Sequence, residues 1–149
     1  MNIPQTYADW LVCFDEMRLG TNDEATVSLM EKGDLSWSSG VAERFSTQLF
    51  DLINYRIEAA SKRLQRNFEM ARGNETAVVT ALLGLKRELK FLKRMAMLPA
   101  IPDDKRSYFA QQIKDYATNA QQSLENSAKS DRSGRLAYVM RNNRIDSLD

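Results

Sequence analysis

The sequence predicts an all-α fold, a helical bundle built on a long central helical hairpin. Apolar residues recur every three or four positions through most of the chain, which is the spacing of an amphipathic helix. Proline occurs only at positions 4, 99 and 102, and between Gly40 and Arg87 the only interior glycines are Gly73 and Gly84. Sustained alternation of apolar and polar residues, the pattern of a half-buried strand, is absent.

Two short helices are predicted at the N-terminus. The first begins at about Pro4 or Thr6 and ends at Leu19 before Gly20, and Thr6 and Asp9 resemble a capping pair. Its apolar positions are Tyr7, Trp10, Leu11, Phe14 and Met17. The second follows a Thr21-x-x-Glu24 capping pattern and ends at Lys32-Gly33, where we expect Gly33 to adopt the left-handed cap conformation.

The central hairpin is predicted over about residues 36–72 and 75–98. Gly73 suits the end of one helix and Asn74 the start of the next, so the two helices should run antiparallel. The expected buried positions are Val41, Phe45, Leu49, Ile53, Ile57, Ala60, Leu64 and Phe68, then Val78, Ala81, Leu82, Leu85, Leu89, Leu92 and Ala96. A straight helix over residues 36–72 would be about 55 Å long, so either it is kinked or the molecule is elongated.

The C-terminal third is predicted to hold one long and one short helix. Pro99 and Pro102 cannot continue the hairpin, and Asp103-Asp104 suits the start of a fifth helix over about residues 103–128. Its inward positions are Phe109, Ile113, Tyr116, Ala120 and Leu124, but its last third is poor in large apolar residues and should fray. We therefore expect one domain over residues 1–130, followed by a hinge and a short helical segment over residues 131–149.

Composition indicates a globular protein in a reducing compartment. The 149 residues are 43% hydrophobic and 28% charged, as in ordinary globular domains. One cysteine cannot form an intramolecular disulfide, and the N-terminus resembles no secretory signal, so we expect a cytoplasmic protein. The charge-free stretch over residues 76–85 is about half of the roughly 20 residues that a membrane-spanning helix needs. No integral membrane association is therefore expected.

The absence of histidine argues against catalysis. A Ser-His-Asp triad, a Cys-His dyad on Cys13 and the Glu-x-x-His motif of di-metal bundles all need a residue that this chain lacks. The sequence contains no glycine-rich phosphate loop, and a lone cysteine cannot specify a zinc site. We expect a non-enzymatic protein without cofactor or metal, in which Cys13 is a small buried residue.

Charge is distributed unevenly along the chain. Residues 1–60 hold 4 basic and 10 acidic residues, whereas residues 61–106 hold 11 basic and 5 acidic ones. The simplest interpretation is that these two regions attract each other. The alternative is a ligand surface on one face of the fourth helix, where cations could bind the phosphates of nucleic acid. That face is formed by Lys86, Arg87, Lys90, Lys93 and Arg94.

Three further residues are candidates for binding. Arg56 and Arg63 are seven residues apart, in the same sector of the third helix as its core residues, so they should be partly buried. The expected explanation is an ion pair with Asp9, Asp15 or Glu16, and the alternative is a pocket for an anionic group. Trp10 and Trp37 should both belong to the core. Trp37 is also a candidate interface anchor, because it lies among serines at a helix start.

The function expected from these features is that of a helical interaction, adaptor or regulatory protein. It would act through helix surfaces on a protein partner or on itself as a homodimer. Apolar residues outside the main stripes favour this interpretation, namely Phe50, Val79, Leu83 and Met97. The alternative is an accessory nucleic-acid-binding protein that contacts the phosphate backbone through the basic helix face.

Overall fold

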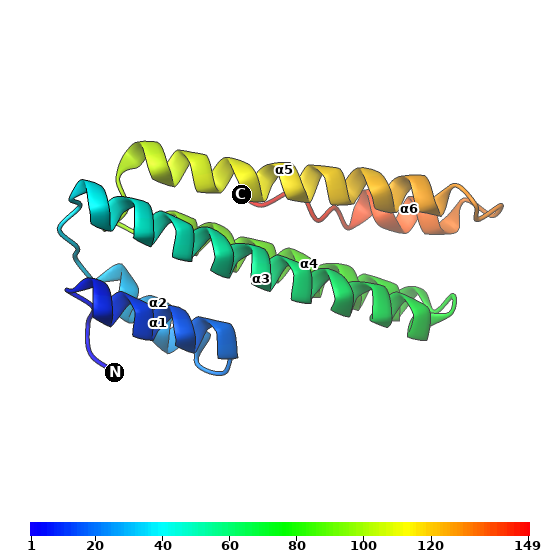
Figure 1. The fold of residues 1–149 in the computed structure, drawn as a ribbon. Coiled ribbons are helices and arrows are strands. Elements are labelled where there is room, and N and C mark those ends of the chain that lie inside the picture. The colour runs from blue at the N-terminus through cyan, green and yellow to red at the C-terminus, as the bar shows by residue number, and fades with distance from the viewer. The chain divides into compact units, whose positions relative to one another are not determined.

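The computed structural model describes residues 1–149 and contains six α-helices and no strand (Figure 1). The helices are α1 (Tyr7–Leu19), α2 (Asp23–Glu31), α3 (Ser39–Ala71), α4 (Glu75–Ala96), α5 (Asp103–Ala128) and α6 (Arg135–Asn142). The predicted all-α bundle on a long helical hairpin is confirmed, and α3 is one continuous helix. None of the helices combines the length and apolar character needed to cross a membrane.

The chain forms two compact units. The first contains Met1–Arg56 and Arg94–Phe109, and the second contains Ile57–Lys93 and Ala110–Asp149. The boundary passes through α3, α4 and α5, so each of these helices contributes residues to both units. Residues 131–149 belong to the second unit.

Helix α1 has the ends that its sequence predicts. The Thr6 side chain accepts a hydrogen bond from the backbone N–H of Asp9, at 3.2 Å. The Asp9 carboxylate in turn accepts from the backbone N–H groups of Gln5 and Thr6, both at 3.1 Å, and these bonds hold the pKa of Asp9 below its ordinary value. Gly20 ends the helix in the left-handed conformation, with φ of 72°.

Helix α2 has the predicted bounds, but neither predicted cap forms. The helix begins at Asp23 after Asn22, and Thr21 does not cap it. Its C-cap is Lys32, with φ of −94°, and Gly33 does not have a positive φ. Gly33 is instead a point of close packing, because a Cβ atom there would lie 2.8 Å from both the Pro4 carbonyl oxygen and Trp10 Cζ2. Glycine is therefore required at this position by packing against distant residues and not by the end of the helix.

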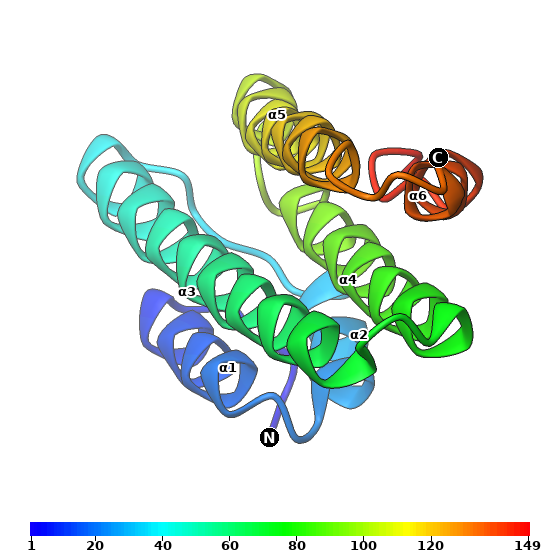
Figure 2. The same cartoon turned by 90° about the vertical axis from the view of Figure 1, so that its right-hand side faces the viewer.

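An aromatic cluster forms the centre of the first unit. Trp10 is fully buried, as predicted, and its indole N–H donates to the Asp34 carbonyl oxygen at 3.1 Å. The Phe45 ring of α3 meets the rings of Trp10 and Phe14 edge to face, with centroids 5.3 Å apart in both pairs. These contacts attach α1 to the first part of α3, and Figure 2 shows α1 lying along it.

The turn of the hairpin is confirmed at the predicted residues. Gly73 has φ of 85°, in the left-handed region, and Asn74 Oδ1 accepts from the backbone N–H of Ala77 at 3.2 Å. Leu49, Leu82 and Leu89 are buried as expected. Leu64 is only half-buried, although its spacing predicts a core position.

Helix α5 continues to Ala128, and α6 lies beside its second half (Figures 1 and 2). Gln121 is buried, and its side chain bonds to two backbone groups of the C-terminal segment. Its Nε2 donates to the Met140 carbonyl oxygen at 3.1 Å, and its Oε1 accepts from the Ile145 N–H at 3.0 Å. A buried amide therefore supports the part of α5 in which the sequence offers few apolar residues.

Candidate functional site

Arg56 forms a partly buried ion pair in the first unit. Its two terminal nitrogens donate to the two carboxylate oxygens of Asp23, at 2.8 and 2.7 Å, and one of them also lies 3.2 Å from the Met17 carbonyl oxygen. The Arg56 side chain is only 10% exposed. The partner is Asp23 of α2 and none of the three carboxylates expected from the sequence. Both terminal nitrogens of the Arg56 guanidinium already bind Asp23, so Arg56 attaches α2 to α3 and does not offer an anion pocket.

Arg63 has a different environment, although it lies one heptad further along α3. The sequence predicts that the Arg63 side chain is partly buried, but in the structure it is exposed. It contributes to a narrow hollow whose other residues come from α3 and α4 of the second unit. Spacing therefore predicted the helix face correctly, but it could not reveal which parts of that face other elements cover.

Two of the five candidate cations on α4 are bound to carboxylates. In the first unit, Arg94 donates to Glu31 at 2.6 and 3.1 Å and to Glu24 at 2.6 Å. These bonds lower the pKa of Glu31 and raise the pKa of Arg94. In the second unit, Lys93 bonds to Asp149 at 3.0 Å and lowers the pKa of that carboxyl.

The remaining three cations of the predicted basic face belong to the second unit. Arg87 and Lys90 are exposed, and Lys86 is half-buried. The sequence left two interpretations of these five cations, pairing with acidic residues of the same chain or binding of an external anion. Lys93 and Arg94 are paired within the chain. The cations available for an anionic ligand are therefore fewer than the sequence implies.

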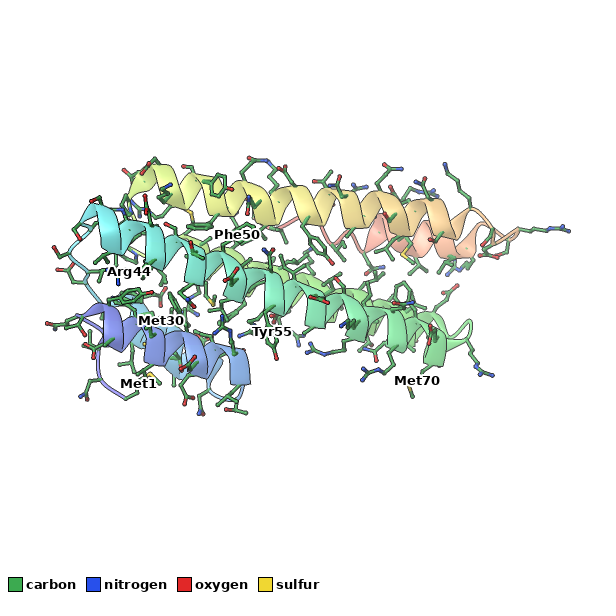
Figure 3. The ribbon with its side chains drawn as sticks, viewed as in Figure 1. Met1, Met30, Arg44, Phe50, Tyr55 and Met70 are labelled. Carbon is green, nitrogen blue, oxygen red and sulfur yellow. The ribbon has the colours of Figure 1, made fainter.

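Trp37 is half-buried and belongs to the aromatic cluster. Its ring meets that of Phe45 edge to face, with centroids 5.1 Å apart. An exposed anchor would instead present most of its indole to solvent. The exposed aromatic residue Phe50 lines a hollow of about 250 Å³ between α3 and α5 of the first unit, and its side chain is labelled in Figure 3.

The second unit contains a groove between α3 and α4, here called the hairpin groove. Two hollows that share Asn67, Thr80 and Ala81 form it, and the wider one has a volume of about 460 Å³. The α3 wall consists of Ala60, Arg63, Leu64, Asn67, Met70 and Ala71. The α4 wall consists of Thr76, Ala77, Thr80, Ala81, Gly84 and Leu85. Met70 is 75% exposed and projects outward from α3 (Figure 3).

Another cavity of the second unit, of about 470 Å³, lies where the hairpin turn meets α6. Phe68, Val78 and Leu136 give it apolar walls. Arg135 and Glu75 form an ion pair at its edge, with one nitrogen–oxygen distance of 3.2 Å. Two of its three charged groups are thus bonded to each other, and the third, Asp131, accepts from Ser133 and from the Leu136 N–H. The hairpin groove instead has an exposed Arg63.

The chain contains no group of three or more His, Cys, Asp or Glu residues placed to hold a metal ion. Cys13 is buried, as predicted, and burial raises the pKa of its thiol, which disfavours the reactive thiolate. Comparisons with protein-family models, with curated proteins and with solved structures find no match for this chain.

The hairpin groove was not predicted, although the sequence carries a signal for it. Thr76, Thr80 and Gly84 repeat every four residues on α4, and Ala77 and Ala81 repeat beside them. Such a row of small side chains leaves space along one face of a helix. The sequence alone does not say whether another helix covers this row. The packing of α3 against α4 shows that the row lines a groove.

Proposed function

We propose that this protein is a non-enzymatic helical interaction protein that binds a helix in the hairpin groove. The helix would belong to a protein partner or to a second copy of the chain. The observation that carries the proposal is the shape of the groove, which runs between two antiparallel helices and has an α4 wall made mainly of small side chains.

The groove suits a helix better than a small polar ligand. Small residues at every fourth position allow another helix backbone to approach closely, and ridge-into-groove packing uses this spacing. The half-buried Leu64 and the exposed Met70 supply apolar surface, and methionine adapts its shape to a partner. An amphipathic helix laid in an apolar groove is a recurrent mode of protein recognition.

Photo-crosslinking tests the proposal. A photoreactive phenylalanine analogue replaces Met70, the cells that produce the protein are irradiated, and mass spectrometry identifies the adducts. The matched control carries the analogue at Gln65, which is exposed and about 140° around the helix from Met70. We expect a discrete protein adduct at Met70 and none at Gln65. Absence of an adduct at Met70, or equal adducts at both positions, rejects the proposal.

The second candidate function is nucleic-acid binding through Lys86, Arg87 and Lys90. Because Lys93 and Arg94 are paired with carboxylates, at most about three phosphates would be neutralised, so binding should be weak and its dependence on salt shallow. Fluorescence anisotropy with a mixed-sequence duplex at about 50 mM salt tests this function, with a variant carrying glutamine at these three positions as the control. A flat trace for the parent protein rejects it.

A further inference from the structure

Helix α1 is apolar on two opposite faces. One face is the buried core face that carries Trp10, Phe14 and Met17. The other face, here called the α1 outer stripe, consists of Ala8, Val12, Asp15 and Leu19. At 100° per residue these four positions lie within an arc of about 60°. Val12 is 52% exposed and Leu19 is 70% exposed, so this apolar surface is uncovered.

The outer stripe has the character of a binding helix. A surface helix normally carries polar residues on its outward face, and a helix that is apolar all round is normally covered on both sides. The single charge of the stripe is Asp15, whose side chain is 77% exposed and whose nearest cation, Arg18, is 3.7 Å away. The stripe thus combines two large apolar side chains with one available carboxylate.

The hairpin groove complements this stripe. Its one lining charge is Arg63, which is exposed, and its other lining residues are small, apolar or uncharged. Ala8 and Leu19 are about 16 Å apart along α1, and the α3 wall from Ala60 to Ala71 has about the same length. A polyanion would need several cations along its path, so a helix with one carboxylate fits this lining better.

The protein already shows how a carboxylate binds this face of α3. In the first unit, Asp23 of α2 holds Arg56 through two short bonds. Arg63 lies one heptad after Arg56, so it occupies the equivalent position on the same face of the helix. The groove therefore presents a second arginine of the same kind to an acidic helix that the second unit does not itself supply.

Net charge favours a second copy of the chain as the source of that helix. The first unit holds 11 acidic and 7 basic residues, a net charge of −4. The second unit holds 9 acidic and 14 basic residues, a net charge of +5. Opposite net charges steer the first unit of one molecule toward the second unit of another, and they orient the encounter.

We infer that two copies of this chain associate by docking the α1 outer stripe of one copy into the hairpin groove of the other, with Asp15 bound to Arg63. This inference rests on the proposed function, because it names the occupant of the same groove. Every copy carries one stripe and one groove, so each copy can both supply a helix and receive one.

Sedimentation velocity of the purified protein over a range up to about 100 μM tests the inference. We expect the parent to associate, and Asp15→Arg and Arg63→Glu each to weaken association at least about tenfold, because each places like charges opposite each other. Both side chains are exposed, so each variant should fold, and urea denaturation verifies this. The matched controls are Asp51→Arg and Arg132→Glu, which make the same charge changes at exposed positions outside both surfaces.

Mixing the two single variants gives the decisive measurement. The arginine introduced by Asp15→Arg would then face the glutamate introduced by Arg63→Glu. The unaltered Asp15 and Arg63 would meet at the second contact, so the mixture should associate more tightly than either variant does alone. A parent that stays monomeric throughout, singles that associate as the parent does, or a mixture that stays monomeric overturns the inference. If Met70 nevertheless crosslinks to a different protein, the proposed function stands and only self-association falls.

Discussion

Asp23 and Arg56 join α2 to α3 through a two-bonded ion pair, with nitrogen–oxygen distances of 2.8 and 2.7 Å. The arginine side chain is largely removed from water, so its charge depends on the carboxylate for solvation. Truncation of one partner leaves the other charge desolvated, which costs more than the net contribution of the intact pair. This relationship makes Asp23 more important for stability than the other carboxylates of the acidic N-terminal region.

Asp23→Ala should therefore lower the free energy of unfolding by about 2 to 4 kcal/mol. Urea denaturation at neutral pH and low protein concentration measures the change. Asp51→Ala is the control, because Asp51 is exposed on α3 and should cost less than about 0.5 kcal/mol. Equal losses in the two variants would show that the ion pair contributes nothing specific.

Gly33→Ala should destabilise the first unit by about 1 to 3 kcal/mol, through overpacking and not through backbone strain. The added methyl group would lie 2.8 Å from Trp10 Cζ2 and from the Pro4 carbonyl oxygen, and backbone and indole cannot both move away cheaply. Gly40→Ala is the matched control, since the nearest atom to its Cβ is 3.8 Å away on the flexible side chain of Arg44. Urea midpoints that shift alike for the two variants would contradict the packing role of Gly33.

The helix ends could be predicted where a few adjacent residues determine them. Thr6 and Asp9 form their capping box within one turn, and Gly73 with Asn74 ends one helix and caps the next. Both arrangements depend only on local geometry, so the sequence contains all the information. The C-terminus of α2 is different, because Gly33 is constrained by Pro4 and Trp10, which are far from it in the chain.

The candidate site was less predictable because it depends on contacts between distant residues. The helical wheel placed the five basic residues of α4 on one face, but Arg94 is bound by Glu31, which is 63 residues away, and Lys93 by Asp149, which is 56 residues away. Spacing also treated Arg56 and Arg63 as equivalent. Their difference arises because Asp23 of α2 reaches Arg56, and no sequence pattern gives the position of α2.

Gln121→Leu should destabilise the second unit by about 2 to 4 kcal/mol, although it makes the core more apolar. The substitution leaves the Met140 carbonyl and the Ile145 N–H buried without partners, and each such group costs about 1 to 3 kcal/mol. Urea denaturation measures the loss, and hydrogen exchange at the Ile145 amide should become faster.

Gln122→Leu is the control for this variant. Gln122 is exposed, and its side chain bonds only to Asn126 one turn further along α5. Its substitution should change stability by less than about 0.5 kcal/mol and leave exchange at Ile145 unaltered. A stabilising effect of Gln121→Leu would show that the two backbone groups find other partners.

The ion pair between Glu31 and Arg94 should make stability depend on pH in the acid range. Hydrogen bonds from Arg94 hold the pKa of Glu31 in the folded protein below the ordinary value of 4.5. The unfolded chain therefore takes up this proton first as pH falls, so the contribution of Glu31 is fully present above about pH 4.5 and decreases below it. Both side chains are more than a third exposed, so solvent screens the pair and the effect should be small.

The test compares the parent with Glu31→Gln by urea denaturation at several pH values between about 3 and 7. The parent should be the more stable protein at neutral pH, and the difference should shrink toward zero as Glu31 becomes protonated. The same substitution made in an Arg94→Gln background supplies the control, because the guanidinium that lowers the Glu31 pKa is then absent. The pH dependence of the difference should disappear in that background. If Arg94 lowers the pKa of Glu31 in the folded protein, the stability difference between the parent and Glu31→Gln must change with pH. A difference that is constant across this range would therefore mean that Arg94 does not bind the Glu31 carboxylate in solution.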